Sequence, residues 1–156
     1  MKKAVIFAFM FMAAINVKAQ NGTKFISLRG GFVAKTAFSG TISLDINTQY
    51  YNQNEIFAEY YQDYNNSKIK SYMGGFVLKP VLFRSGNTAL RLRMGAGLGT
   101  ATTKFAVAPQ LGFEIAQSLG KGFDLLLINR NQVIIFGNTP QRWRVGVEAG
   151  IRIPIN

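Results

Sequence analysis

Hydrophobic and polar residues alternate with a period of two along most of this chain of 156 residues. The clearest case is 143–155, in which Trp143 and every second residue as far as Ile155 are apolar. The positions between them carry Arg144, Glu148 and Arg152, together with glycines and a proline. Because successive side chains of a β-strand point to opposite faces, this pattern predicts a strand with one apolar and one charged face.

The same period recurs in a series of runs separated by short stretches that are rich in Gly, Asn, Ser, Thr or Pro, the residues that favour turns. Pro80 has no N–H for a β-ladder, so we expect a strand end or a bulge there. The run 123–136 is the least regular, and its alternation leaves the register open. No helical period competes, and the pattern predicts eight strands: 24–33, 38–47, 54–63, 68–83, 88–99, 104–117, 123–136 and 142–156.

The first 19 residues have the pattern of a cleaved signal peptide. Lys2 and Lys3 precede an apolar run over 4–15, and Val17 and Ala19 supply the small residues expected before a cleavage site. The apolar run is shorter than the roughly 20 residues that a membrane-spanning helix needs. We therefore expect export, with 1–19 as the signal peptide and 20–156 as the mature domain.

An even number of strands of this length behind a signal peptide is typical of outer-membrane barrels, whose sheet must close because lipid cannot pair an open edge. We predict an all-β fold: an eight-stranded antiparallel up-and-down outer-membrane β-barrel with short loops, whose apolar face contacts outer-membrane lipid. The alternative is a secreted soluble β-barrel or β-sandwich binding protein with the apolar face inward. Long apolar columns, and arginines that alternate with glycines, favour the barrel. Aromatic residues near strand ends, Tyr61 and Trp143 among them, are expected at the membrane interfaces.

In the barrel, the charged faces of the strands line the interior. The interior of an eight-stranded barrel is filled by side chains, and a buried arginine requires a partner. Glu55, on the same face as Glu59, is a further counter-ion for the arginines, and the glycines of these faces leave room for long side chains. We therefore predict a structural charge network in the lumen made of Arg29, Asp45, Glu59, Arg91, Arg93, Glu114, Arg142, Arg144, Glu148 and Arg152.

The composition narrows the possible chemistry, because the chain has neither cysteine nor histidine. Disulfides and thiolate chemistry are excluded, and the commonest general base and metal ligand is missing. We therefore predict no enzyme, no catalytic residue, no cofactor and no metal site. The net charge of +11 becomes +8 without Lys2, Lys3 and Lys18. The basic residues stand singly at alternate positions rather than in a cluster, so we expect no direct contact with nucleic acid, and the pattern assigns no oligomeric state.

The C-terminal third, FEIAQSLGKGFDLLLINRNQVIIFGNTPQRWRVGVEAGIRIPIN, resembles the end of the conjugative-transposon protein TraO family, and NEIFAEYYQDY (54–64) resembles a strand of that family. The resemblance implies an outer-membrane component of a conjugative, type IV secretion-like apparatus, with other proteins of that apparatus as partners. The alternative is a generic small outer-membrane envelope protein. The residues that carry the resemblance are Asn129, Arg130, Asn131, Phe136, Gly137, Gly146, Gly150, Ile151, Arg152, Ile155 and Asn156.

Overall fold

The computed structural model describes residues 22–33, 37–120, 122–137 and 139–155, and the predicted signal peptide lies outside this part of the chain. The described part forms nine β-strands and one short 3₁₀ helix, η1 (Gln49–Tyr51). The strands are β1 (Lys24–Val33), β2 (Ala37–Asn47), β3 (Gln53–Asp63), β4 (Lys70–Lys79), β5 (Val81–Ser85), β6 (Thr88–Ala101), β7 (Lys104–Ser118), β8 (Asp124–Val133) and β9 (Trp143–Ile155).

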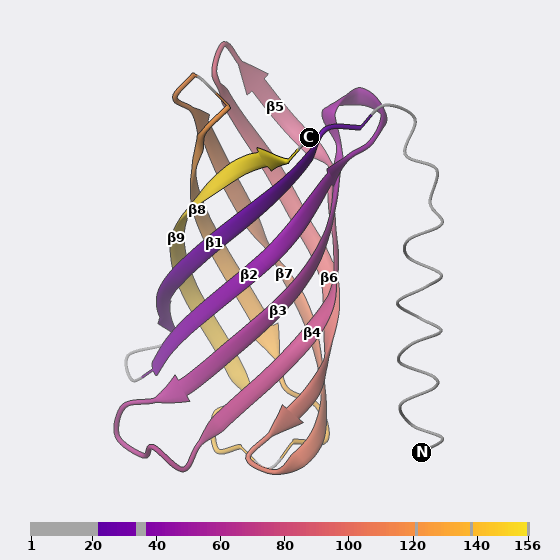
Figure 1. Ribbon diagram of the computed structural model, residues 1–156. Coiled ribbons are helices and arrows are strands. Elements are labelled where there is room, and N and C mark those ends of the chain that lie inside the picture. Colours follow the sequence, from indigo (N-terminus) through magenta and orange to yellow (C-terminus); the bar gives the residue numbers. More distant parts are fainter. Residues whose placement is uncertain (1–21, 34–36, 121, 138, 156) are drawn as a thin grey trace.

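The strands form one antiparallel sheet that closes on itself (Figure 1). Neighbours in sequence pair with one another, β1 pairs with β9, and the pairing of β4 with β6 completes the ring. β4 and β5 pair with successive parts of the same strand, β6, so together they count as one strand of the barrel wall. The barrel wall therefore has eight strands, and the predicted all-β antiparallel barrel is confirmed.

The break between β4 and β5 lies at Pro80, where the sequence predicted a strand end or a bulge. The Pro80 carbonyl still accepts a hydrogen bond from the Leu92 N–H at 3.0 Å, although the proline donates none. The register against β6 shifts between Val81 and Phe83. The Asn52 side chain accepts a hydrogen bond from the Val81 N–H at 3.0 Å, so the connection between β2 and β3 holds the start of β5.

The outer surface of the barrel is apolar on every side. Leu28, Ile42, Leu111, Leu127 and Val147 are each about half exposed, and they lie in the middle parts of different strands. Within the described strands, the exposed charged residues stand at or near strand ends: Lys24, Lys70, Arg84 and Lys104. This is the reverse of a soluble protein, in which apolar side chains face inward, and it contradicts the soluble sandwich alternative. Among the described residues, no helix is long and apolar enough to cross a bilayer.

Glycines on the inner face stand beside the long charged side chains, as the sequence pattern indicated. Gly150 pairs with Arg29, and Gly112 pairs with Arg93 on one side and with Arg130 on the other. A glycine has no side chain in the lumen, so each of these pairs leaves room for one extended guanidinium group. The strands also approach closely here, since a Cβ added to Gly150 would lie 2.2 Å from the Leu28 carbonyl oxygen.

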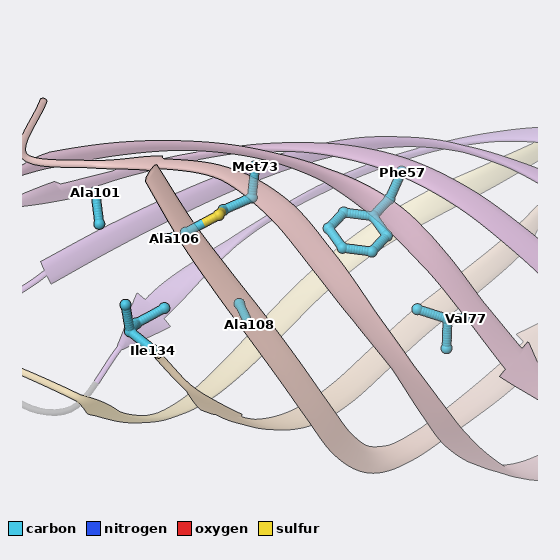
Figure 2. Packing of buried hydrophobic residues seen from close by; sticks show 7 residues of the cluster. All are labelled: Phe57, Met73, Val77, Ala101, Ala106, Ala108 and Ile134. Carbon is cyan, nitrogen blue, oxygen red and sulfur yellow. The ribbon is translucent and has the colours of Figure 1, made fainter. Parts of the chain in front are cut away.

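Apolar side chains fill the interior near the connections between β1 and β2 and between β6 and β7. One cluster contains Phe57, Met73, Val77, Ala101, Ala106, Ala108 and Ile134 (Figure 2). A second contains Val33, Ala37 and Tyr61, with Ile69 packed against it. Most interior apolar side chains thus lie toward this end, together with Asp63 and Arg144, and most charged residues occupy the middle and the end where β1 begins and β9 finishes.

Candidate functional site: the charged barrel interior

Two carboxylates, Glu55 of β3 and Glu114 of β7, form the centre of the interior network, and both are fully buried. Arg93 of β6 lies between them: its Nη1 is 2.7 Å from Glu55 Oε2 and 2.9 Å from Glu114 Oε2. The ammonium group of Lys79 is 3.1 Å from Glu55, 3.0 Å from Glu114 and 2.7 Å from Asp45. Two cations are therefore held by three carboxylates, and the five groups come from five strands.

A second group lies deeper, toward the apolar end. Arg130 of β8 donates two hydrogen bonds to Glu59, at 2.8 and 3.1 Å, and its Nη2 is 3.0 Å from Glu148. Arg29 of β1 joins the two groups, because it binds Glu55 with both terminal nitrogens and its Nε lies 3.6 Å from Glu148. Hydrogen-bonded ion pairs of this kind compensate the desolvation of buried charges. The network thus connects opposite walls of the barrel across the lumen.

At the end where β1 begins, the network reaches a more open mouth. Arg152 of β9 donates from Nε to Asp124 at 2.9 Å and from Nη1 to the Gln53 side chain at 2.6 Å. Arg91 of β6 donates from Nη1 to Glu114 at 3.2 Å. These two arginines therefore form the layer of the network nearest the mouth, and Lys79 and Glu114 lie further inside the barrel.

Arg144 differs from the other buried cations, since it makes no ion pair with a described carboxylate, although it is only 1% exposed. Its guanidinium carbon lies 3.6 Å from the ring centre of Tyr61, and its Nη2 donates to the Ser71 hydroxyl at 2.7 Å. An aromatic face and a hydroxyl, rather than a carboxylate, are therefore the described partners of this cation. Tyr61 is fully buried, so its predicted place at the membrane interface is wrong.

All seven acidic residues of the chain face the interior. Six are buried, and the seventh, Asp124, lines the mouth against Arg152. The exposed charged residues of the described chain are all basic: Lys24, Lys68, Lys70, Arg84, Lys104 and Arg142. The acidic side chains are therefore confined to the interior, where six of the seven form ion pairs with buried basic residues, whereas basic residues lie on both faces.

The structure brings together nine of the ten residues predicted for the lumen and excludes one. Arg29, Asp45, Glu59, Arg91, Arg93, Glu114, Arg144, Glu148 and Arg152 are all buried inside the barrel. The prediction for Arg142 is wrong, because the chain reaches β9 only at Trp143 and Arg142 is exposed in the preceding connection. Sequence reasoning missed Lys79 and Arg130, which face inward on β4 and β8.

This arrangement neutralises charge rather than exposing a reactive group. The carboxylates at the centre of the network already accept hydrogen bonds from cations: Glu55 accepts from Arg29 and Arg93, and Glu114 accepts from Lys79. In the described part of the chain, no group of acidic side chains has the arrangement of a metal site. The interior therefore has the chemistry of a plug, which joins the strands and fills the lumen.

No family model and no curated protein matches this sequence. Solved structures match the fold over most of the chain. Neisserial surface protein A (NspA) matches with a TM-score of 0.67 and 15% identity, over 86% of this chain and 96% of that one. This chain has the fold of an outer-membrane β-barrel. A de novo designed transmembrane β-barrel also matches, with a TM-score of 0.57 and 12% identity, over 86% of this chain and 96% of the design.

Proposed function

We propose that this chain is an integral β-barrel of the Gram-negative outer membrane, exported with a cleaved signal peptide, and that it has a structural role in the cell envelope. The observation that carries the proposal is the sorting of side chains by face. All seven acidic side chains lie inside the barrel, and large apolar residues cover the outer face of every strand of the wall. Such a surface is unfavourable in water and is satisfied by acyl chains.

The filled lumen supports a structural role over a transporting one. Ion pairs span the middle of the barrel, and apolar side chains occupy one end. An eight-stranded barrel leaves little interior space beyond its own side chains. Passage of a cargo through one subunit would require the central ion pairs to separate in a medium of low dielectric constant.

The single tryptophan provides the membrane test. Trp143 is 72% exposed at the first residue of β9, which corresponds to the edge of the apolar belt. In vesicles of brominated phospholipids, bromine near the headgroups should quench Trp143 more than bromine near the bilayer centre. A W143F/L127W variant, with tryptophan in the middle of β8, should show the opposite order. Failure of brominated lipid to quench either protein would refute membrane insertion.

The specific role that we propose is that of a non-catalytic component of a conjugative transfer apparatus, which rests on the sequence resemblance to the TraO family. Deletion of the gene from a donor cell should reduce transfer of the element to background, and expression of the chain in trans should restore it. Unchanged transfer in the deletion strain would overturn this role and leave the generic envelope protein. The quenching experiment is independent of that outcome.

A further inference from the structure

A cavity of about 280 Å³ opens at the end of the barrel where β1 begins and β9 finishes. Its lining includes Arg84 of β5, Arg91 of β6 and Arg152 of β9, with amide side chains from Gln53 and Asn87. The buried pairs between Lys79 and Glu114 and the apolar cluster of Figure 2 fill the barrel further along. The cavity is therefore a blind vestibule rather than the mouth of a channel.

The charged side chains that line the vestibule are predominantly basic. Three arginines face one carboxylate, Asp124, so the lining charges sum to +2, from three positive and one negative. Arg152 is already occupied, because it donates to both Asp124 and Gln53. Arg91 pairs with Glu114, which lies outside the lining, so Arg84 carries the charge that no described carboxylate neutralises.

Both of these arginines keep unused hydrogen-bond donors. Arg91 is only 6% exposed; its Nη1 donates to Glu114, whereas its buried Nε has no partner in the described structure. Arg84 makes no ion pair with a described residue, and its guanidinium carbon lies 4.1 Å from the ring centre of Tyr51. Stacking on an aromatic ring fixes the plane of a guanidinium group and leaves its N–H groups free to bind a ligand in that plane. A buried donor without a partner, such as the Arg91 Nε, is rare in native proteins, and Arg91 lines the cavity.

We propose that this vestibule binds a phosphate group, with Arg84 and Arg91 as its principal donors. A phosphate monoester carries about −1.5 to −2 charges near neutral pH, and the lining has three arginines to one carboxylate. Its tetrahedral oxygens accept paired hydrogen bonds from guanidinium groups. The volume lies just below the range of about 300–1,000 Å³ typical of small-molecule sites, so the vestibule has room for the phosphate group and a small part of its carrier. The site is additional to the structural role proposed above, and it depends on neither conjugation nor membrane orientation.

The proposal is tested by calorimetric titration of the folded full-length mature chain, in zwitterionic detergent, with inorganic phosphate at constant ionic strength. Malonate is the matched dicarboxylate probe. We expect saturable phosphate binding that R84Q and R91Q each weaken about tenfold or more, which corresponds to the loss of roughly one charged hydrogen bond. R142Q is the control, because Arg142 is an exposed arginine at the opposite end of the barrel.

R84Q is the decisive variant, because Arg84 is exposed and outside the central network, so its substitution leaves the barrel folded. Heat-modifiable gel mobility verifies the fold of each variant before titration. Absence of saturable phosphate binding, an equal loss in R142Q, or unchanged binding in R84Q would overturn the site. Malonate binding as tight as phosphate would overturn the assignment to phosphate.

Discussion

Replacing Glu55 with glutamine should destabilise the barrel more than any single substitution at its mouth. Glu55 is fully buried and accepts four hydrogen bonds, two from Arg29 at 2.8 and 3.0 Å and two from Arg93 at 2.7 and 2.8 Å. Lys79 lies 3.1 Å away. Glutamine keeps the shape of the side chain but removes its charge, and its amide group turns a donor toward guanidinium groups that can only donate.

The magnitude follows from the number of cations that lose their anion. Removal of one partner from a buried ion pair costs about 3–5 kcal/mol, because the remaining charge stays buried without compensation. Arg93 and Lys79 retain Glu114 at 2.9 and 3.0 Å, so the loss is shared rather than threefold. We therefore expect a decrease of about 3–5 kcal/mol in the free energy of unfolding, or roughly two to three and a half orders of magnitude in the folding equilibrium.

The assay is reversible urea unfolding in phospholipid vesicles, followed by the fluorescence of Trp143. D124N is the control, since Asp124 lies at the mouth and Arg152 keeps its hydrogen bond to Gln53; a loss of about 1 kcal/mol is expected. In the double variant E55Q/R93M the two losses should fall short of additive by about 1–3 kcal/mol, because the residues share one network. Strict additivity, or an E55Q effect no larger than that of D124N, would refute the reasoning.

Three further substitutions test the outer face, the strand contacts and the unpaired cation, all by the same unfolding assay. L127R places a charge at the middle of the apolar belt and should cost about 2–4 kcal/mol, whereas F105R at a strand end should cost about 1 kcal/mol or less; equal costs would argue against a membrane-facing belt. G75A should destabilise the barrel by at least about 1–3 kcal/mol, because the added Cβ would lie 2.2 Å from a backbone oxygen. G74A is the control, since its added Cβ would have no neighbour nearer than 3.6 Å. Similar effects of the two variants would contradict the close approach of the strands. R144M should change stability by less than about 1 kcal/mol or increase it, because it removes a buried cation that has no described carboxylate partner, and a loss of 3 kcal/mol or more would show that the contact with the aromatic ring carries the charge.

The fold could be predicted from sequence because period-two alternation reports both the strands and their two faces. The predicted strand was one residue too long at Arg142, because the alternation in the sequence begins one residue before β9. Tyr61 was placed wrongly for a different reason: an aromatic residue near a strand end suits either a membrane interface or an interior cation, and Arg144 lies elsewhere in the sequence. Composition near a strand end therefore does not assign a side chain to one face.

The interior pairs were less accessible to sequence reasoning than the strands. Arg130 was missed because β8 carries Leu126 and Ile128 on its inward face, so apolar residues occupy both faces and hide the alternation. Lys79 could have been found by extending the inward face of β4, but the adjacent Pro80 obscured the strand end. The pairing of Arg130 with Glu59 depends on closure of the barrel, which no local pattern encodes.

In the membrane-inserted barrel that we propose, the enclosure of the acidic side chains has a consequence for the surrounding lipids. With all acidic groups enclosed, the rims present only ammonium and guanidinium groups among the described residues, such as Lys24 at one end and Lys104 at the other. Acidic headgroups in either leaflet therefore meet no like-charged side chain in the described barrel wall, and each rim attracts them. The same carboxylates that hold the strands together from within are thereby kept from repelling the membrane outside.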